Sequence, residues 1–133
     1  MKANFSHGEH LMTPRTGFSH HGIYVGRGWV VHYDGLNTGL KKGAVTRVKL
    51  DDFAAGRPVA VRRYRHRLYG AKESVLRALS CVGENNYHAV FNNCEHFVSW
   101  CITGRRKSRQ VRIYLGLSLV VSTLAARLAH SKK

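Results

Sequence analysis

The stretch that decides the fold of this 133-residue chain reads Asn92-Asn93-Cys94-Glu95-His96-Phe97-Val98. Either asparagine can accept a hydrogen bond from a first-turn N–H, and the glutamate complements the positive end of a helix macrodipole. Apolar residues continue the segment, and Gly104 suits the left-handed position that follows a helix C-terminus. The pattern predicts a helix that starts at or beside Cys94.

A cysteine at a helix N-terminus is a candidate nucleophile. Peptide dipoles and free N–H groups there favour thiolate over thiol, and the same N–H groups can hold the oxyanion that forms when sulfur attacks a carbonyl. Cys94 can therefore supply the nucleophile where oxyanion donors are already present. The alternative for an isolated cysteine is a small buried residue that closes the start of a helix.

A second motif lies upstream and reads His20-His21-Gly22-Ile23-Tyr24-Val25-Gly26-Arg27-Gly28-Trp29-Val30-Val31-His32-Tyr33. Aromatic and β-branched residues on both sides of a Gly-x-Gly turn are typical of a β-hairpin. Side chains alternate faces along a strand, so the length of the turn decides which histidines point the same way. The motif predicts two antiparallel strands that carry histidines.

Two registers of this hairpin are open. A two-residue loop sends His20 and His32 to opposite faces of the sheet. A three-residue loop pairs Val25 with Trp29, sets His32 opposite Gly22, and makes His20 its diagonal neighbour on the same face. The second glycine of the turn suits the left-handed position that ends a three-residue loop, which favours this register.

Two histidines on one face and a cysteine at a helix start form the nucleophile, base and orienting group of thiol acyl-transfer catalysis. In this set Cys94 is the nucleophile. His20 is the general base, which holds the cysteine as an ion pair and returns the proton to the leaving group, and His32 binds the other ring nitrogen and fixes the tautomer. His21 then faces away. A single strand histidine is more often a residue with a satisfied hydrogen bond, so the hypothesis depends on the three residues together.

Both motifs resemble those of the lecithin retinol acyltransferase family, which includes the HRAS-like phospholipase/acyltransferases. The similarity is carried by residues 20–26, 30–33 and 93–98, within a region of about residues 15 to 104. It implies an α+β, circularly permuted papain-like fold, in which a small antiparallel sheet packs on a helix with the catalytic cysteine at its N-terminus. Permutation accounts for histidines that precede the cysteine.

The resemblance also implies a function and a site. Cys94 matches the family nucleophile, His20 the first histidine and His32 the second. Family members take an acyl chain from a phospholipid as a thioester and pass it to water, an amine or an alcohol. This implies a glycerophospholipid substrate and no cofactor.

The rest of the chain predicts further elements of one small domain. Residues 44–50 and 58–64 alternate basic and apolar residues and predict strands, with a turn between them at Gly56-Arg57-Pro58. Residues 71–81 have helical spacing, and residues 87–91 predict a short strand. We expect an N-terminal extension over residues 1–14, a catalytic domain over 15–104, and a basic and apolar tail over 105–133.

The three cysteines form no Cys-x-x-Cys pair and no disulfide framework, which suits a reducing compartment. We expect Cys81 and Cys101 in the core. Cys94, Glu95 and His96 lack the ligand pairs and spacing of a structural zinc site, so no metal is expected. His96 is predicted to pack or to form hydrogen bonds.

The formal net charge of +15 is typical of a small nucleic-acid-binding protein, but the positions of the charges favour a membrane. One basic cluster lies within residues 62–67, and a second, within 105–112, directly precedes an apolar run. Basic residues beside an apolar helix are attracted to anionic headgroups. We expect residues 105–133 to bind an anionic membrane surface, with nucleic acid as the less favoured partner.

The apolar run covers residues 113–126, which are fourteen uncharged residues. As a helix this run would be about 21 Å long, which is shorter than the roughly 30 Å hydrocarbon core of a membrane. It therefore either spans the membrane with the help of flanking arginine and lysine side chains that snorkel, or lies in the membrane interface. The resemblance favours the membrane, since several relatives carry a C-terminal anchor. A helix packed in the core or at an oligomer interface is the alternative.

Residues 1–15 contain no apolar stretch of the kind that a secretory signal needs. We therefore expect the protein at the cytoplasmic face of a membrane, or in the cytoplasm with peripheral membrane association.

The leading hypothesis is a thiol-dependent acyltransferase or phospholipase A-type hydrolase. A cysteine peptidase or amidase of the same fold requires the same three residues. The third hypothesis is a non-catalytic basic module that binds RNA or membranes, whose nucleic-acid binding would weaken steeply with salt.

Overall fold

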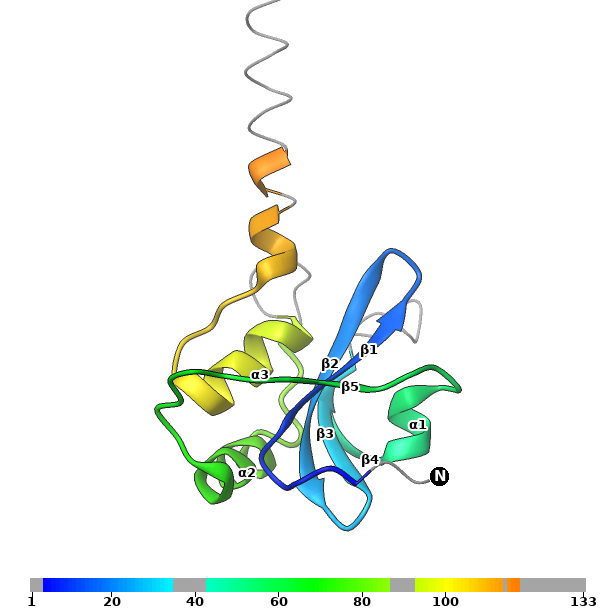
Figure 1. Cartoon of the computed structure of the whole chain (residues 1–133), viewed down its shortest axis with the longest axis vertical. Helices are drawn as coiled ribbons and strands as arrows, with labels where there is room; N and C mark the ends of the chain where they lie inside the picture. The colour runs from blue at the N-terminus through cyan, green and yellow to red at the C-terminus, as the bar shows by residue number, and fades with distance from the viewer. Residues whose placement is uncertain (1–3, 35–42, 87–92, 114, 118–133) are drawn as a thin grey trace, which may run out of the picture.

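A five-stranded antiparallel sheet forms the centre of the computed structural model, which describes residues 4–34, 43–86, 93–113 and 115–117 (Figure 1). Its strand order is β4-β3-β2-β1-β5. The strands are β1 (His10–Arg15), β2 (Phe18–Gly26), β3 (Trp29–Tyr33), β4 (Val45–Lys49) and β5 (Ala60–Arg62). The expected α+β fold with a small antiparallel sheet is confirmed.

Helices cover both faces of the sheet (Figure 1). α2 (Ala71–Ser80) and α3 (Cys94–Thr103) pack on one face, and the short α1 (Leu50–Ala54) packs on the other. Because side chains alternate along a strand, the sheet has two cores. Ile23 and Val31 contribute to the core beneath α3, whereas Leu11, Val30 and Phe53 form the core beneath α1.

The β2–β3 hairpin combines features of both expected registers. Arg27 and Gly28 form a two-residue connection with φ values of 53° and 83°, and Gly26 pairs with Trp29, so the expected Val25–Trp29 pair is wrong. A β-bulge between Tyr24 and Gly26 then shifts the register by one residue. As a result Gly22 lies opposite His32, as the three-residue loop predicted.

The first strand crosses the expected domain boundary. Residues 10–14, which we expected in an N-terminal extension, form most of β1, which lies between β2 and β5. The strand pattern is weak at the level of sequence because Thr13 and Pro14 interrupt the apolar alternation. Pro14 is tolerated near the end of the strand, where it pairs with Ser19.

The strand predicted at 44–50 and the helix predicted at 71–81 are confirmed as β4 and α2, and the strand predicted at 58–64 is present as the shorter β5. The short helix α1 between β4 and β5 was not predicted. α2 buries the small residues Ser74 and Ala78, while the side chains of Leu76 and Leu79 remain exposed. The predicted strand at 87–91 lies outside the described residues.

The beginning of the C-terminal tail is helical at residues 109–113 and 115–117, and most of the predicted apolar run lies outside the described residues. Ile113, Leu115 and Leu117 expose their side chains. Among the helices in the described part of the chain, none has the length and apolarity that a membrane crossing needs.

Gly22 should tolerate no side chain, because a Cβ there would lie 2.6 Å from Val30 Cγ1 and 2.9 Å from Phe53 Cε2. We expect Gly22→Ala to lower the free energy of unfolding by about 1–3 kcal/mol through overpacking. Chemical denaturation measures the change. Gly70→Ala is the control, because nothing lies within 4 Å of a Cβ there. Equal stability of the two variants would contradict the packing of α1 on the sheet.

Candidate active site

α3 starts with a reciprocal capping box. The Asn93 side chain accepts a hydrogen bond from the His96 backbone N–H at 3.0 Å, and the Asn93 N–H donates to His96 Nδ1 at 3.2 Å. Gly104 ends the helix with a φ of 74°. The predicted helix start, the hydrogen-bonding role of His96 and the glycine stop are confirmed. Cys94 is the first residue of the helix.

The Cys94 side chain is buried where α3 meets the edge of β2. β3 pairs with β2 only from Gly22 onward, where it lies opposite His32. Among the described residues, the next backbone N–H along this edge belongs to His21, and its hydrogen bond to the Cys94 sulfur acts to lower the thiol pKa. The structure therefore places the sulfur against the backbone of the residue that follows His20.

His20 and His32 form a hydrogen-bonded pair on the α1 face of the sheet. His20 Nε2 lies 2.6 Å from His32 Nδ1, and Phe53 packs against both rings, with centroid distances of 5.3 and 5.9 Å. The expectation that the two histidines share a face is confirmed. Because His32 occupies Nε2 of His20, Nδ1 is the ring nitrogen left to face another group. Within the described residues no hydrogen bond joins the His20 ring to the Cys94 thiol.

Burial sets the charge state of these residues. It raises the pKa of the Cys94 thiol to about 11, although hydrogen bonds from backbone N–H groups, including those of His21 and Glu95, act in the opposite direction. Burial, with smaller contributions from the neighbouring His32 and Arg15, also lowers the pKa of His20 to about 3. Desolvation therefore opposes the preference for thiolate expected at the helix start, because burial destabilises the thiolate by more than the N–H groups stabilise it. Both pKa shifts favour the neutral thiol and the neutral imidazole.

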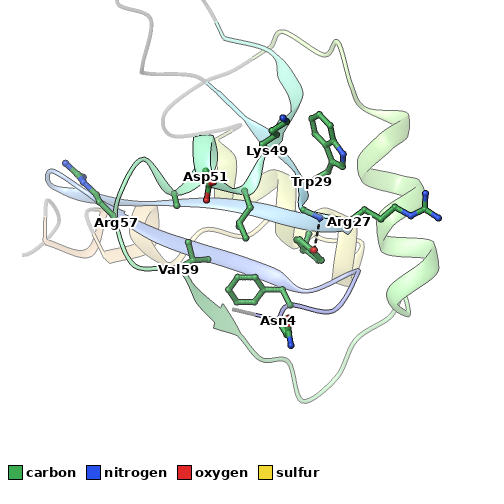
Figure 2. Close-up of a pocket in the computed structure, with 12 residues that line it drawn as sticks. Asn4, Arg27, Trp29, Lys49, Asp51, Arg57 and Val59 are labelled. Atoms are coloured by element: carbon green, nitrogen blue, oxygen red, sulfur yellow. Dashed lines mark hydrogen bonds between the residues drawn. The ribbon is translucent and has the colours of Figure 1, made fainter. Parts of the chain in front are cut away.

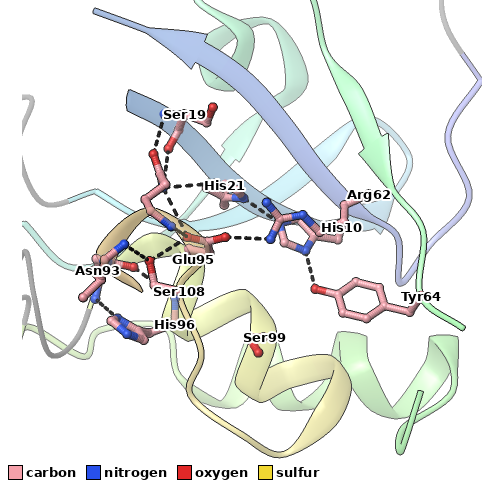
Figure 3. Close-up of polar contacts among 12 residues, drawn as sticks. His10, Ser19, His21, Arg62, Tyr64, Asn93, Glu95, His96, Ser99 and Ser108 are labelled. Atoms are coloured by element: carbon pink, nitrogen blue, oxygen red, sulfur yellow. Dashed lines mark hydrogen bonds and ion pairs between the residues drawn. The ribbon is translucent and has the colours of Figure 1, made fainter. Parts of the chain in front are cut away.

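A second histidine pair occupies the other face of β2 (Figure 3). His21 Nδ1 lies 2.6 Å from His10 Nε2, and His10 Nδ1 lies 2.6 Å from the Tyr64 hydroxyl. Burial lowers the pKa of His21 to about 4 and that of His10 well below its ordinary value. Sequence reasoning placed His21 away from His20 correctly but missed His10, because it did not recognise β1.

Glu95 is a fully buried carboxylate directly after Cys94 (Figure 3). Arg62 of β5 donates to Oε2 at 2.7 Å, and the Ser108 hydroxyl donates to Oε1 at 2.6 Å. Burial alone would raise the pKa of Glu95, but the hydrogen bonds from Ser108 and Arg62 outweigh it and hold the pKa at about 2. The carboxylate is therefore ionised. No sequence pattern connected it to Arg62 or Ser108.

The remaining cysteines lie away from this junction. Cys101 is fully buried in the core beneath α3, as expected, whereas Cys81 is partly buried at its margin. In the part of the chain that the structure describes, no group of three or more histidine, cysteine or acidic side chains is arranged to hold a metal ion.

A cavity of about 740 Å³ lies between the hairpin turn and α1 (Figure 2). Its apolar wall includes Phe5, Tyr24 and Val59, and cationic side chains such as Arg27 and Arg57 also line it. Cys94, His20 and His32 are not among its lining residues. The junction of α3 with β2 is therefore separate from this cavity.

The model of the lecithin retinol acyltransferase family matches residues 3–107 of the chain. The chain belongs to this family. The match begins ahead of residue 15, in agreement with the position of β1 inside the sheet.

Individual members of the lecithin retinol acyltransferase family are also similar to the chain. The bovine lecithin retinol acyltransferase is 31% identical over 81% of this chain and 59% of its own length. The mouse protein is 30% identical over 96% of this chain and 67% of its own length, and the human protein is 30% identical over 81% and 59%. The chain thus spans about three fifths to two thirds of these relatives, which are named as acyltransferases.

The low pKa of Glu95 predicts a specific acid sensitivity. Its pKa falls from an ordinary 4.5 to about 2 in the fold, so its stabilising contribution is complete above pH 4.5 and is lost as the pH falls towards 2. We expect this contribution to be on the order of 3 kcal/mol. Chemical denaturation at pH values from 7 to 2 should show a shallower acid loss of stability for Glu95→Gln than for the unmodified protein.

The buried histidines titrate in both proteins, so the difference between the two curves reports Glu95 together with its effect on the pKa of His21. Glu95→Gln should also be less stable at neutral pH, because it leaves Arg62 without its carboxylate. Parallel curves over the whole range would mean that Glu95 is not ionised in the folded protein.

Proposed function

We propose that this protein is a thiol-dependent acyltransferase or phospholipase A-type hydrolase, which acts on acyl esters of glycerophospholipids through a thioester on Cys94. Family membership supports acyl transfer on lipids. The observation that carries the proposal is the position of Cys94, whose sulfur contacts the His21 N–H directly beside the hydrogen-bonded pair of His20 and His32. In this proposal Cys94 is the nucleophile, His20 the base and His32 the orienting group.

In the first half-reaction His20 acts as the general base. Its Nδ1 takes the thiol proton while the Cys94 sulfur attacks the ester carbonyl carbon, so a C–S bond forms and the carbonyl oxygen becomes an oxyanion. Backbone N–H groups at the start of α3 and at His21 are the candidate oxyanion donors. The C–O bond to the lysophospholipid then breaks, and His20 returns its proton to that leaving oxygen.

The second half-reaction releases the acyl group. His20 Nδ1 takes a proton from water, an amine or an alcohol as that acceptor attacks the thioester carbonyl. The C–S bond breaks, and the proton passes to the sulfur, which restores the neutral thiol. In this mechanism His20 keeps its ring proton on Nε2 and donates it to His32 Nδ1, which lies 2.6 Å away, so the orienting residue fixes the tautomer that leaves Nδ1 of His20 to act.

The neutral resting pair favours proton transfer during attack over a preformed ion pair. With a thiol pKa of about 11, only about one molecule in 10⁴ carries a thiolate at neutral pH. The helix N-terminus alone therefore does not ionise the thiol, and a neighbouring base has to take the thiol proton during attack.

The arrangement of the domain is consistent with a circularly permuted papain-like fold. The strands with the two histidines precede the helix with the cysteine in the chain, and that helix packs on the same strands. Residues 15–104, together with β1, would form the catalytic unit.

The tail over residues 105–133 would hold the enzyme on the anionic, cytoplasmic face of a membrane. Arg105, Arg106 and Lys107 are exposed and precede the exposed apolar side chains of the tail helix. Each such basic residue is worth about 1 kcal/mol near an anionic surface.

Intact-protein mass spectrometry tests the proposed function. After mixing with phosphatidylcholine vesicles, the protein should gain the mass of one acyl chain in an adduct that hydroxylamine removes. Cys94→Ala should carry no adduct, and His20→Ala should form it at least about 100-fold more slowly, because general-base catalysis contributes about 10²–10⁴-fold. His32→Ala should fall between them, and Cys101→Ala is the control.

Two other results would contradict the proposal. If the protein stays unmodified by lipid esters while peptide thioesters or amides label Cys94, the peptidase or amidase alternative replaces it. If neither labels Cys94 and the protein binds RNA with a steep dependence on salt, the chain is a basic binding module.

A further inference from the structure

The side chain of Gln110 joins the two segments that carry the proposed nucleophile and base. Its Oε1 accepts a hydrogen bond from the Ser19 backbone N–H at 2.8 Å, and its Nε2 lies 3.3 Å from the Ser19 carbonyl oxygen. The same Nε2 lies 3.3 Å from Glu95 Oε1. Ser19 immediately precedes His20, and Glu95 immediately follows Cys94, so one amide bridges both sides of the site (Figure 3 shows Ser19 and Glu95).

Gln110 binds the edge of β2 beyond its last residue pair with β3. Backbone N–H groups two residues apart point to the same edge of a strand, so the N–H groups of Ser19 and His21 face the same way, beyond the end of β3. The His21 N–H binds the Cys94 sulfur, and the Ser19 N–H and carbonyl bind the Gln110 amide. Gln110 thus stands where a continued β3 would have paired with Ser19.

Gln110 is itself fixed relative to α3. Ser108 accepts from the Val111 N–H at 3.1 Å through its hydroxyl, and its carbonyl accepts from the Arg112 N–H at 3.1 Å, so it begins the helical turn that contains Gln110. The Ser108 hydroxyl donates to Glu95, and the Gln110 backbone N–H lies 3.3 Å from the same carboxylate oxygen. The buried, ionised Glu95 therefore anchors the backbone from which the Gln110 side chain reaches Ser19.

From this geometry we propose that Gln110 is a positioning residue, which sets the separation between the Cys94 sulfur and the His20 ring. The inference rests on the proposed function, because it assumes that His20 assists the Cys94 thiol. Without the bridge, the Ser19 N–H and carbonyl lose their hydrogen bonds to Gln110, and the segment is held by its pairing with β1 and by the contact of His20 with His32. A displacement of about 1 Å between reacting groups can cost about 100-fold in rate.

The test is the pH profile of Cys94 alkylation by iodoacetamide, followed by peptide mass spectrometry. The unmodified protein should show a plateau near neutral pH, where His20 assists the thiol, and an alkaline limb, where the thiolate reacts without a base. Gln110→Met keeps a straight side chain of similar length and helix propensity but removes the amide. We expect it to lower the plateau about 10- to 100-fold and to leave the alkaline limb within about twofold.

Gln110→Glu should lose the plateau as well, because a carboxylate cannot donate to the Ser19 carbonyl and would lie beside the ionised Glu95. Glu73→Met, at an exposed position of α2, is the control and should keep both parts of the profile. If Gln110→Met fails to fold, Ser108→Ala serves as the second variant. We expect it to lower the plateau about 3- to 10-fold, because it removes the hydroxyl that binds Glu95 and so holds Gln110 less firmly.

The outcomes separate this inference from the proposed function. A plateau that survives in Gln110→Met but disappears in His20→Ala would overturn the positioning role and leave the proposed function standing. A plateau and an alkaline limb that fall together would show that Gln110 supports only the fold. An unmodified protein whose profile matches that of His20→Ala would overturn the proposed function itself, and the inference with it.

Discussion

The structure depends on one buried charge. Glu95 lies at the second position of α3 and is fully removed from solvent, yet it is ionised because Arg62, Ser108 and Gln110 surround it with donors. Its partners come from the edge strand β5 and from the segment that follows α3. Breaking a buried ion pair leaves an uncompensated charge, which costs more than most single contacts. The carboxylate therefore fixes the start of α3, and with it Cys94, against the sheet.

β2 separates two histidine pairs with different surroundings. His20 points to the α1 face and binds His32, while His21 points to the α3 face and binds His10. Alternation along one strand therefore places two chemically similar dyads back to back. The backbone N–H of His21 contacts the Cys94 sulfur. The thiol meets β2 beyond its last residue pair with β3, between these two histidine pairs.

Local sequence patterns predicted those parts of the fold that depend on neighbouring residues along the chain. The helix start at Cys94, its cap and its glycine stop followed from capping preferences, and the shared face of His20 and His32 followed from strand alternation. The two histidines share that face for a different reason from the one predicted, because a β-bulge rather than a three-residue loop sets the register. Contacts between distant segments were not predictable in this way. The partners of Glu95 and the strand at residues 10–15 have no periodic signature, and the thiol pKa depends on burial, which a single segment does not reveal.

The central claim of this account is that the thiol and imidazole of the site are neutral at rest and exchange a proton only during attack. Nitrogen NMR of the histidine rings in the folded protein tests it most directly. The account predicts that His20 is a neutral imidazole at neutral pH, with its proton on Nε2, and that it gains a second proton only well below pH 6.5, because burial lowers its pKa. An imidazolium signal from His20 at neutral pH that disappears in Cys94→Ala would contradict the account and establish a thiolate–imidazolium pair instead.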